Sequence, residues 1–107
     1  MAGVKEKEFT IKKPEMFKVL DISTCHITKN DGALLSRSGK TFLDGDPIVY
    51  DYGEGSFVYC GGLANGPYKN SSPEFNQILE FANRKGCRYV CFDCDGPEYP
   101  DIPRFDW

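Results

Sequence analysis

The chain has 107 residues, a net charge of −3 at pH 7, and 40% hydrophobic and 14% aromatic residues. This length and composition fit one folded domain with a modest core and exclude global disorder. No apolar run approaches the ~20 residues that cross a bilayer, and the charged residues 1–15 lack the hydrophobic stretch of a secretory signal. We therefore expect a cytoplasmic protein without membrane contact, whose five cysteines are reduced thiols.

The charge is unevenly distributed along the chain. Residues 41–60 carry four acidic and no basic side chains, and residues 91–107 carry five acidic and one basic, whereas residues 1–40 carry eight basic and five acidic ones. Direct nucleic-acid binding is not expected, because phosphate contacts require the opposite sign of charge. The two acidic blocks are either ordinary acidic loops or, if the fold joins them, one negative face for a basic partner protein that handles nucleic acid.

The first third of the chain predicts a leader, a strand and a short helix. Residues 1–14 form a polar segment that we expect to be flexible, and the mostly apolar residues 17–24 predict a buried strand. Thr28 and Asp31 have the spacing of a helix N-cap and an acidic third residue. A helix ending near Gly39 should follow, with these apolar side chains directed inward: Ala33, Leu34 and Leu35.

The remaining elements are a hairpin, a longer helix and a last strand. Residues 47–62 predict the hairpin, Ser72 and Gly86 mark the start and stop of the helix, and residues 87–94 predict the strand. A helix that returns to the last strand is expected to be a right-handed crossover, which favours a parallel strand pair. Residues 15–107 should therefore form a single α+β domain, a two-layer sandwich of split βαβ type with an extended C-terminal tail.

Two motifs near the C terminus resemble chemical sites. Cys91 and Cys94 form a Cys-x-x-Cys pair, but on a strand their side chains would point to opposite faces, and no second ligand pair or following helix supports metal or redox chemistry. The stretch FDCDG resembles the nucleophile motif of haloacid-dehalogenase-type phosphatases, yet it lies near the end of the sequence and continues with Pro97 where that motif has threonine. We expect a strand end and a turn, without a metal or a cofactor.

The stretch STCHIT contains the only histidine. His26 and Cys25 are sequence neighbours, which point apart in an extended chain and make a poor nucleophile pair. If the first and last strands are parallel neighbours, His26 would lie at the same end of the sheet as Asp93 and Asp95, where α/β sheets place ligands. His26 and a carboxylate would then line a polar pocket, either as a catalytic pair or as a structural hydrogen-bond network.

The stretches LDISTCHITKND and FDCDGPEYPDIPRFDW together resemble a family of short bacterial proteins of unknown function, found on plasmids and phages. Its members have a Ser-Thr-x-His-Ile-Thr opening, an Asp-x-Asp-Gly-Pro turn, a Leu-Pro or Ile-Pro step and an aromatic-acidic-Trp ending. The resemblance implies neither an activity nor a cofactor, and it suggests a mobile-element setting in which small acidic proteins inhibit host defence systems. The pattern falls on Ser23, Thr24, His26, Ile27, Thr28, Asp93, Asp95, Gly96, Pro97, Pro103, Asp106 and Trp107.

Our leading hypothesis is a small acidic, non-enzymatic protein-interaction module that inhibits a host nucleic-acid-handling or defence complex. The aromatic tail, with Trp107, either anchors the partner or packs back on the sheet. The alternatives are a small hydrolase or transferase that uses His26 with Asp93 or Asp95, and a purely structural domain. The residues expected to contact a protein partner are acidic or aromatic: Asp44, Asp46, Asp51, Glu54, Asp93, Asp95, Glu98, Asp101, Phe105, Asp106 and Trp107.

Overall fold

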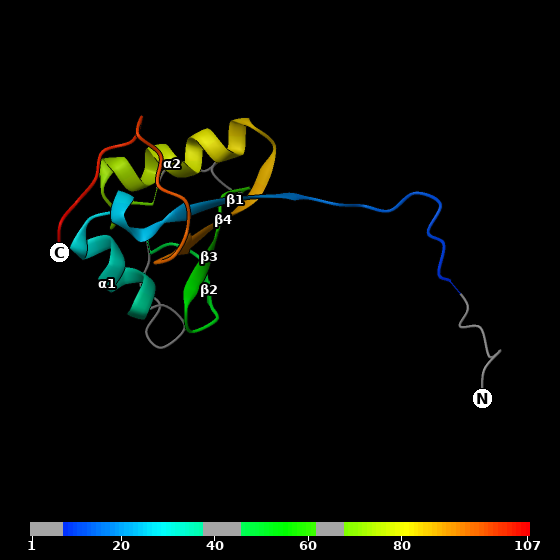
Figure 1. Cartoon of the computed structure of the whole chain (residues 1–107), viewed down its shortest axis with the longest axis horizontal. Coiled ribbons are helices and arrows are strands. Elements are labelled where there is room, and N and C mark those ends of the chain that lie inside the picture. Colours follow the sequence, from blue (N-terminus) through cyan, green and yellow to red (C-terminus); the bar gives the residue numbers. More distant parts are fainter. Residues whose placement is uncertain (1–7, 38–45, 62–67) are drawn as a thin grey trace.

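The computed structural model describes residues 8–37, 46–61 and 68–107. A four-stranded sheet with strand order β1-β4-β3-β2 forms one layer and two helices form the other, as Figure 1 shows. The predicted α+β class and the predicted order of strand, helix, hairpin, helix and strand are confirmed. The elements are β1 (Lys18–Ser23), a 3-10 turn (Thr24–His26), α1 (Lys29–Arg37), β2 (Val49–Asp51), β3 (Gly55–Tyr59), α2 (Pro73–Arg84) and β4 (Cys87–Asp93).

The first and last strands are parallel neighbours. β1 pairs with β4 in parallel register, and β4, β3 and β2 then follow in antiparallel order. The helix α2 connects β3 to β4, which are antiparallel neighbours, so the predicted crossover through this helix is wrong although the parallel pair exists. The register shifts between Lys18 and Val19, which pair with Cys87 and Tyr89, and Arg88 is the extra residue of this bulge.

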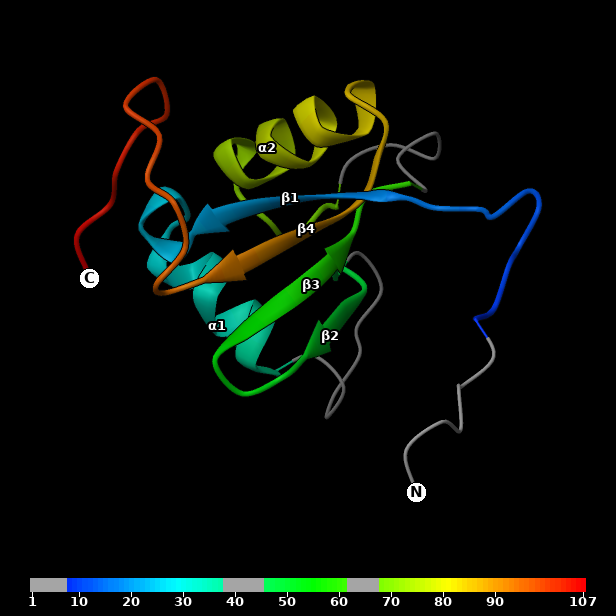
Figure 2. The same cartoon turned by 45° about the vertical axis from the view of Figure 1, so that its right-hand side comes forward.

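The hydrophobic core lies between the sheet and the helices. Strand residues that point to this side alternate with outward ones, and they pack against the apolar stripe of α2. Figure 2 shows both helices behind or above the sheet, so no described helix crosses its near face. Of the three apolar α1 residues predicted to point inward, Leu35 is buried and Leu34 is half-buried, whereas Ala33 is exposed, contrary to the prediction. The buried contacts come from Ile22, Val58, Val90 and Phe92 on the strands and from Phe75, Ile78, Leu79 and Ala82 on α2.

A buried carboxylate joins the N-termini of the two helices. Thr28 N–H donates to Asp31 Oδ2 (3.1 Å) and Asp31 N–H donates to Thr28 Oγ1 (3.1 Å), which confirms the predicted cap of α1. Ser72 donates to the same carboxylate from its backbone N–H (2.9 Å) and its hydroxyl (2.6 Å). The Ser72 hydroxyl also accepts from Phe75 N–H at 3.1 Å, as expected for the N-cap of α2. Asp31 therefore fixes both helices relative to each other.

None of the described helices is long and apolar enough to cross a bilayer.

Candidate functional site

The C-terminal tail runs back along the end of β1 and the 3-10 turn. Ser23 N–H donates to the Pro97 carbonyl (2.8 Å), and Phe105 N–H donates to the Cys25 carbonyl (2.8 Å). These bonds join two segments that are more than seventy residues apart in the sequence. The predicted proximity of STCHIT and the last stretch of the chain is therefore present, and these main-chain bonds are part of it.

His26 is the central residue of this contact. Its side chain is 0% exposed, and its Nε2 accepts a hydrogen bond from Tyr99 N–H (2.9 Å). The ring proton therefore lies on Nδ1, which donates to the Pro103 carbonyl (2.9 Å). Neither nitrogen is left for a carboxylate, so the expected pairing of His26 with Asp93 or Asp95 is wrong. The reason is the 3-10 turn, which redirects the chain after β1 so that His26 meets the tail.

Trp107 packs back on the domain, the second of its two predicted roles. The indole N–H donates to the Ile27 carbonyl (3.0 Å). The ring lies so close to Gly32 that a Cβ on this residue would be 2.6 Å from Cη2 of the indole. Trp107 remains 58% exposed, and it borders the same surface hollow as Asp51 and Glu54. The end of the tail and the hairpin turn therefore line one hollow.

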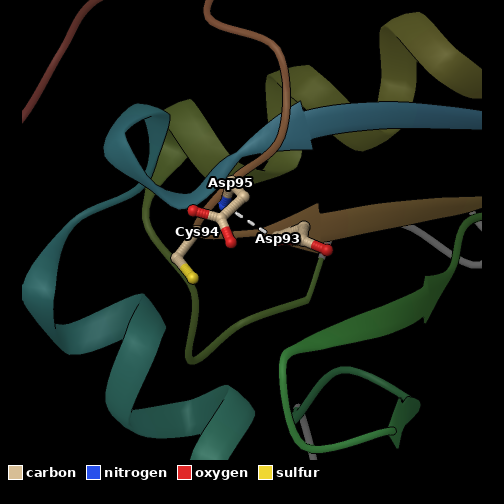
Figure 3. A group of neighbouring side chains, drawn as sticks. All are labelled: Asp93, Cys94 and Asp95. Carbon is tan, nitrogen blue, oxygen red and sulfur yellow. Dashed lines mark hydrogen bonds between the residues drawn. The ribbon is translucent and has the colours of Figure 1, made fainter.

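Asp93, Cys94 and Asp95 form a turn at the end of β4, as Figure 3 shows. Asp93 Oδ1 accepts from Asp95 N–H (2.8 Å), which closes the turn, and Oδ2 accepts from the Tyr52 hydroxyl (2.7 Å). Each of the three residues offers one possible metal-ligand atom, and these three atoms lie within 4.8 Å of one another, close enough to bind the same cation. Because Asp93 already accepts a hydrogen bond at each oxygen, the turn is explained without an ion.

Tyr52 links this turn to the hairpin through a short hydrogen-bond chain. Its hydroxyl donates to Asp93, so the phenol oxygen accepts from the Cys91 thiol at 3.3 Å. The hydrogen bonds to Cys91 and Asp93 raise the pKa of Tyr52. The hydrogen bond from the Tyr52 hydroxyl, and to a lesser degree the one from Asp95 N–H, lowers the pKa of Asp93. Burial raises the pKa of the Cys91 thiol, which makes it a poor nucleophile at neutral pH.

The fold brings part of each of the two acidic blocks together at one end of the sheet. Gly55, which follows Glu54, pairs with Asp93 in the β3–β4 register, and Tyr52, which follows Asp51, donates to Asp93. The acidic end, as we call it, consists of Asp51, Glu54, Asp93 and Asp95.

The other residues predicted to contact a partner do not belong to the acidic end. Asp46 is buried and accepts from Asn70 Nδ2 (2.9 Å), and Glu98 forms an ion pair with Arg104 in the tail. Asp44 lies outside the described residues. The remaining predicted contacts belong to the tail, where Phe105 is half-buried and Asp101 and Asp106 are exposed.

The outer face of the sheet carries a row of aromatic side chains that the sequence analysis did not single out as a site. Tyr52 and Phe57 lie with ring centroids 5.4 Å apart, and Phe57 and Tyr89 with centroids 6.4 Å apart. The alternating aromatic residues of the hairpin, Tyr50 and Tyr52 followed by Phe57 and Tyr59, were the signal in the sequence. We call this the aromatic face: Phe17, Tyr50, Tyr52, Phe57, Tyr59 and Tyr89.

A small hollow lies within the aromatic face. It has a volume of about 240 Å³ and is lined by Phe17, Tyr50, Phe57 and Tyr89. The guanidinium of Arg88 lies over the ring of Phe17, 4.5 Å from its centroid, and Phe17 is one of the four rings that line the hollow. The aromatic face therefore extends from one cation at Arg88 to the acidic end, with Tyr52 as the last ring.

Comparison with known protein families places this chain in a family of unknown function. A profile described as a family of unknown function (DUF5983), C-terminal domain, matches residues 19–107, and the chain belongs to this family. Comparisons with curated proteins and with solved structures find no match. The expectation of an uncharacterised family is confirmed. Apart from Lys18, the first residue of β1, the match includes every described strand and helix, and residues 8–18 lie outside it.

Proposed function

We propose that the protein is a small acidic, non-enzymatic interaction module whose aromatic face and acidic end bind a basic segment of a partner protein. The observation that carries this proposal is that, among the described residues, neither helix nor tail covers the aromatic face, which continues through Tyr52 into the acidic end. Large exposed apolar patches on soluble proteins are commonly interaction sites.

The aromatic face has the properties of an interface core. Tyr50 is 59% exposed and Phe17 is half-exposed, although both are large apolar side chains. Tyrosine and other aromatic residues carry much of the energy of protein interfaces because they bury a large area at low entropic cost. The hollow of about 240 Å³ suits one apolar side chain of the partner, since drug-sized ligands occupy sites of roughly 300 Å³ or more.

The charges suggest the partner's chemistry and its direction. Carboxylates at the acidic end favour lysine or arginine, whereas Arg88 disfavours a cation at the other end. Tyr89 and Asp93 are four residues apart on β4, so the hollow and the acidic end are separated by about 13 Å at ~3.3 Å per residue. An extended partner segment would place an apolar residue in the hollow and a basic residue about four positions away.

Single-stranded nucleic acid is the competing ligand for an exposed aromatic sheet. Such binding requires basic groups along the face, but among the described residues Arg88 is the cation that lies over a ring of the aromatic face, and four carboxylates form the acidic end. The charge favours a basic protein. Proteins that handle nucleic acid present such basic surfaces, so inhibition of a host nucleic-acid-handling or defence complex is the role that we propose for this module.

Peptide selection on the intact chain would test this function. We expect random nonapeptides selected against the wild-type protein to be basic, with an apolar residue about four positions from a lysine or arginine. Selected peptides should lose binding to Tyr50→Ser and Glu54→Lys, and keep it with Glu80→Lys, which makes the same change of charge on α2. Enrichment of acidic peptides, or tighter binding of a single-stranded oligodeoxythymidine than of any peptide, would overturn the proposal.

A further inference from the structure

An apolar groove lies between α2 and the C-terminal tail, separate from the aromatic face and the acidic end. Its volume is about 420 Å³. Two carboxylates, those of Glu74 and Asp101, belong to its lining, and the groove residues include no lysine, arginine or histidine. The groove therefore suits an apolar segment with a positive charge. Its apolar lining is made by Leu20, Ile78, Phe81, Tyr99, Ile102 and Pro103.

The segment of chain before β1 has this chemistry. Figure 1 shows residues 8–17, the arm, extending away from the body of the domain. Phe9 is 97% exposed, Ile11 71% and Met16 85%, which is unusual for three large apolar residues in one short segment. Lys12 and Lys13 follow Ile11 directly. The arm thus combines unpartnered apolar side chains with the charge that the groove lacks.

We propose that the groove binds residues 9–13 of the arm of a second copy of this chain, so that two copies dimerise by exchanging arms. In an extended segment Phe9, Ile11 and Lys13 point to the same side and Lys12 points to the other. The arm bends at Lys12 and Lys13 in the free chain, so binding straightens it there, and Pro14 favours the extended conformation at Lys13. Phe9 and Ile11 then contact the apolar lining, and the Lys13 ammonium pairs with Asp101 or Glu74.

The dimensions of the two segments agree. Glu74 and Phe81, which line the groove, are seven helical residues apart, or about 10 Å at ~1.5 Å per residue. Phe9 and Lys13 span about 13 Å in an extended chain at ~3.3 Å per residue. A five-residue stretch of the arm is therefore long enough to occupy the groove from one end to the other.

The geometry at the base of the arm favours a second copy over the arm of the same chain. Lys18 Nζ donates to the Lys85 carbonyl (3.1 Å), so the arm leaves the domain beside the C-terminal end of α2. Phe17 is held on the aromatic face by Tyr89, with ring centroids 5.4 Å apart, and by the guanidinium of Arg88. To reach its own groove, the arm would have to reverse its direction in the few residues before Phe17, whereas Figure 1 shows it extending away from the domain.

Sedimentation velocity of the full chain over a range of concentrations tests the exchange. We expect a monomer–dimer equilibrium that weakens with salt, because part of the attraction is between charges. Ile11→Asp and Lys13→Glu should each weaken dimerisation at least tenfold, whereas Lys12→Glu, the same charge change on the opposite side of the arm, should not. Combining Lys13→Glu with Asp101→Lys should restore the dimer, because the ion pair is rebuilt with its charges reversed.

Three results would overturn the proposal. The first is a monomer at every concentration, and the second is a dimer that Ile11→Asp leaves unchanged. The third is docking within one chain, which would give nuclear Overhauser contacts between Ile11 and Phe81 in a uniformly labelled sample but none in an isotope-filtered mixture of labelled and unlabelled copies. Tyr50→Ser, which alters the aromatic face, should leave dimerisation unchanged, so failure of this inference is distinguishable from failure of the proposed function.

Discussion

Replacement of His26 with alanine should release the C-terminal tail while the rest of the domain stays folded. The change removes the acceptor for Tyr99 N–H and the donor to the Pro103 carbonyl, both at 2.9 Å. Two hydrogen bonds of about 1 kcal/mol each, and a buried N–H left without a partner at about 1–3 kcal/mol, give a loss of about 3–5 kcal/mol. The middle of this range, about 4 kcal/mol, is below the ~5–15 kcal/mol stability of a typical domain, so folding should survive.

Tryptophan fluorescence is a direct assay for this release, because Trp107 is the only tryptophan and lies in the tail. In His26→Ala we expect a red-shifted native emission, a lower urea midpoint and faster amide hydrogen exchange at Tyr99 and Phe105. Tyr99→Phe is the matched control, since it removes only the bond from the phenol to the Asp21 carbonyl (2.8 Å). Native emission and a urea midpoint that match the wild type would refute the role of His26 as the residue that holds the tail.

Three further substitutions test other contacts. Asp31→Ala should lower the free energy of unfolding by about 3–5 kcal/mol, because the capping bonds to a charged group are lost; an unchanged urea midpoint would contradict the helix-joining role. Tyr52→Phe should raise the pKa of Asp93 towards its ordinary value, as followed by carboxyl-carbon NMR. In the wild type, the lowered pKa of folded Asp93 stabilises the protein above the unfolded-state pKa of ~3.9, and this stability is lost as the pH falls. Tyr52→Phe should therefore lose less stability in acid than the wild type. A steeper loss than in the wild type would count against the Tyr52–Asp93 hydrogen bond. Gly32→Ala should displace the Trp107 ring, because the added Cβ would lie 2.6 Å from it; wild-type emission would show that the ring was not displaced.

The secondary structure was largely predictable because its signals are local. The cap at Thr28, the start of α2 at Ser72 and the stop at Gly86, where φ is +86°, depend on a few neighbouring residues. The role of α2 was less predictable, because strand order decides whether a helix links parallel or antiparallel strands. The periodicity of the sequence does not contain that order.

The candidate site was predictable in its location but not in its contacts. The parallel pairing of β1 with β4 brings STCHIT to the C-terminal segment, as expected, but the 3-10 turn aims His26 at main-chain groups of Tyr99 and Pro103. Sequence patterns do not reveal main-chain partners that are distant in the chain. The aromatic face was missed because alternating tyrosine and phenylalanine residues also suit a buried strand, and only the placement of the helices distinguishes the two faces.

The affinity of a selected basic nonapeptide for the full chain tests the central claim most directly. At low salt, we predict that Glu54→Lys and Tyr50→Ser each weaken binding at least tenfold, while Glu80→Lys changes it less than twofold. Chemical-shift changes on binding should concentrate at Phe57, Tyr89 and Asp93. Equal affinity for all three variants, or shift changes confined to the groove beside α2, would contradict a partner site on the aromatic face and acidic end.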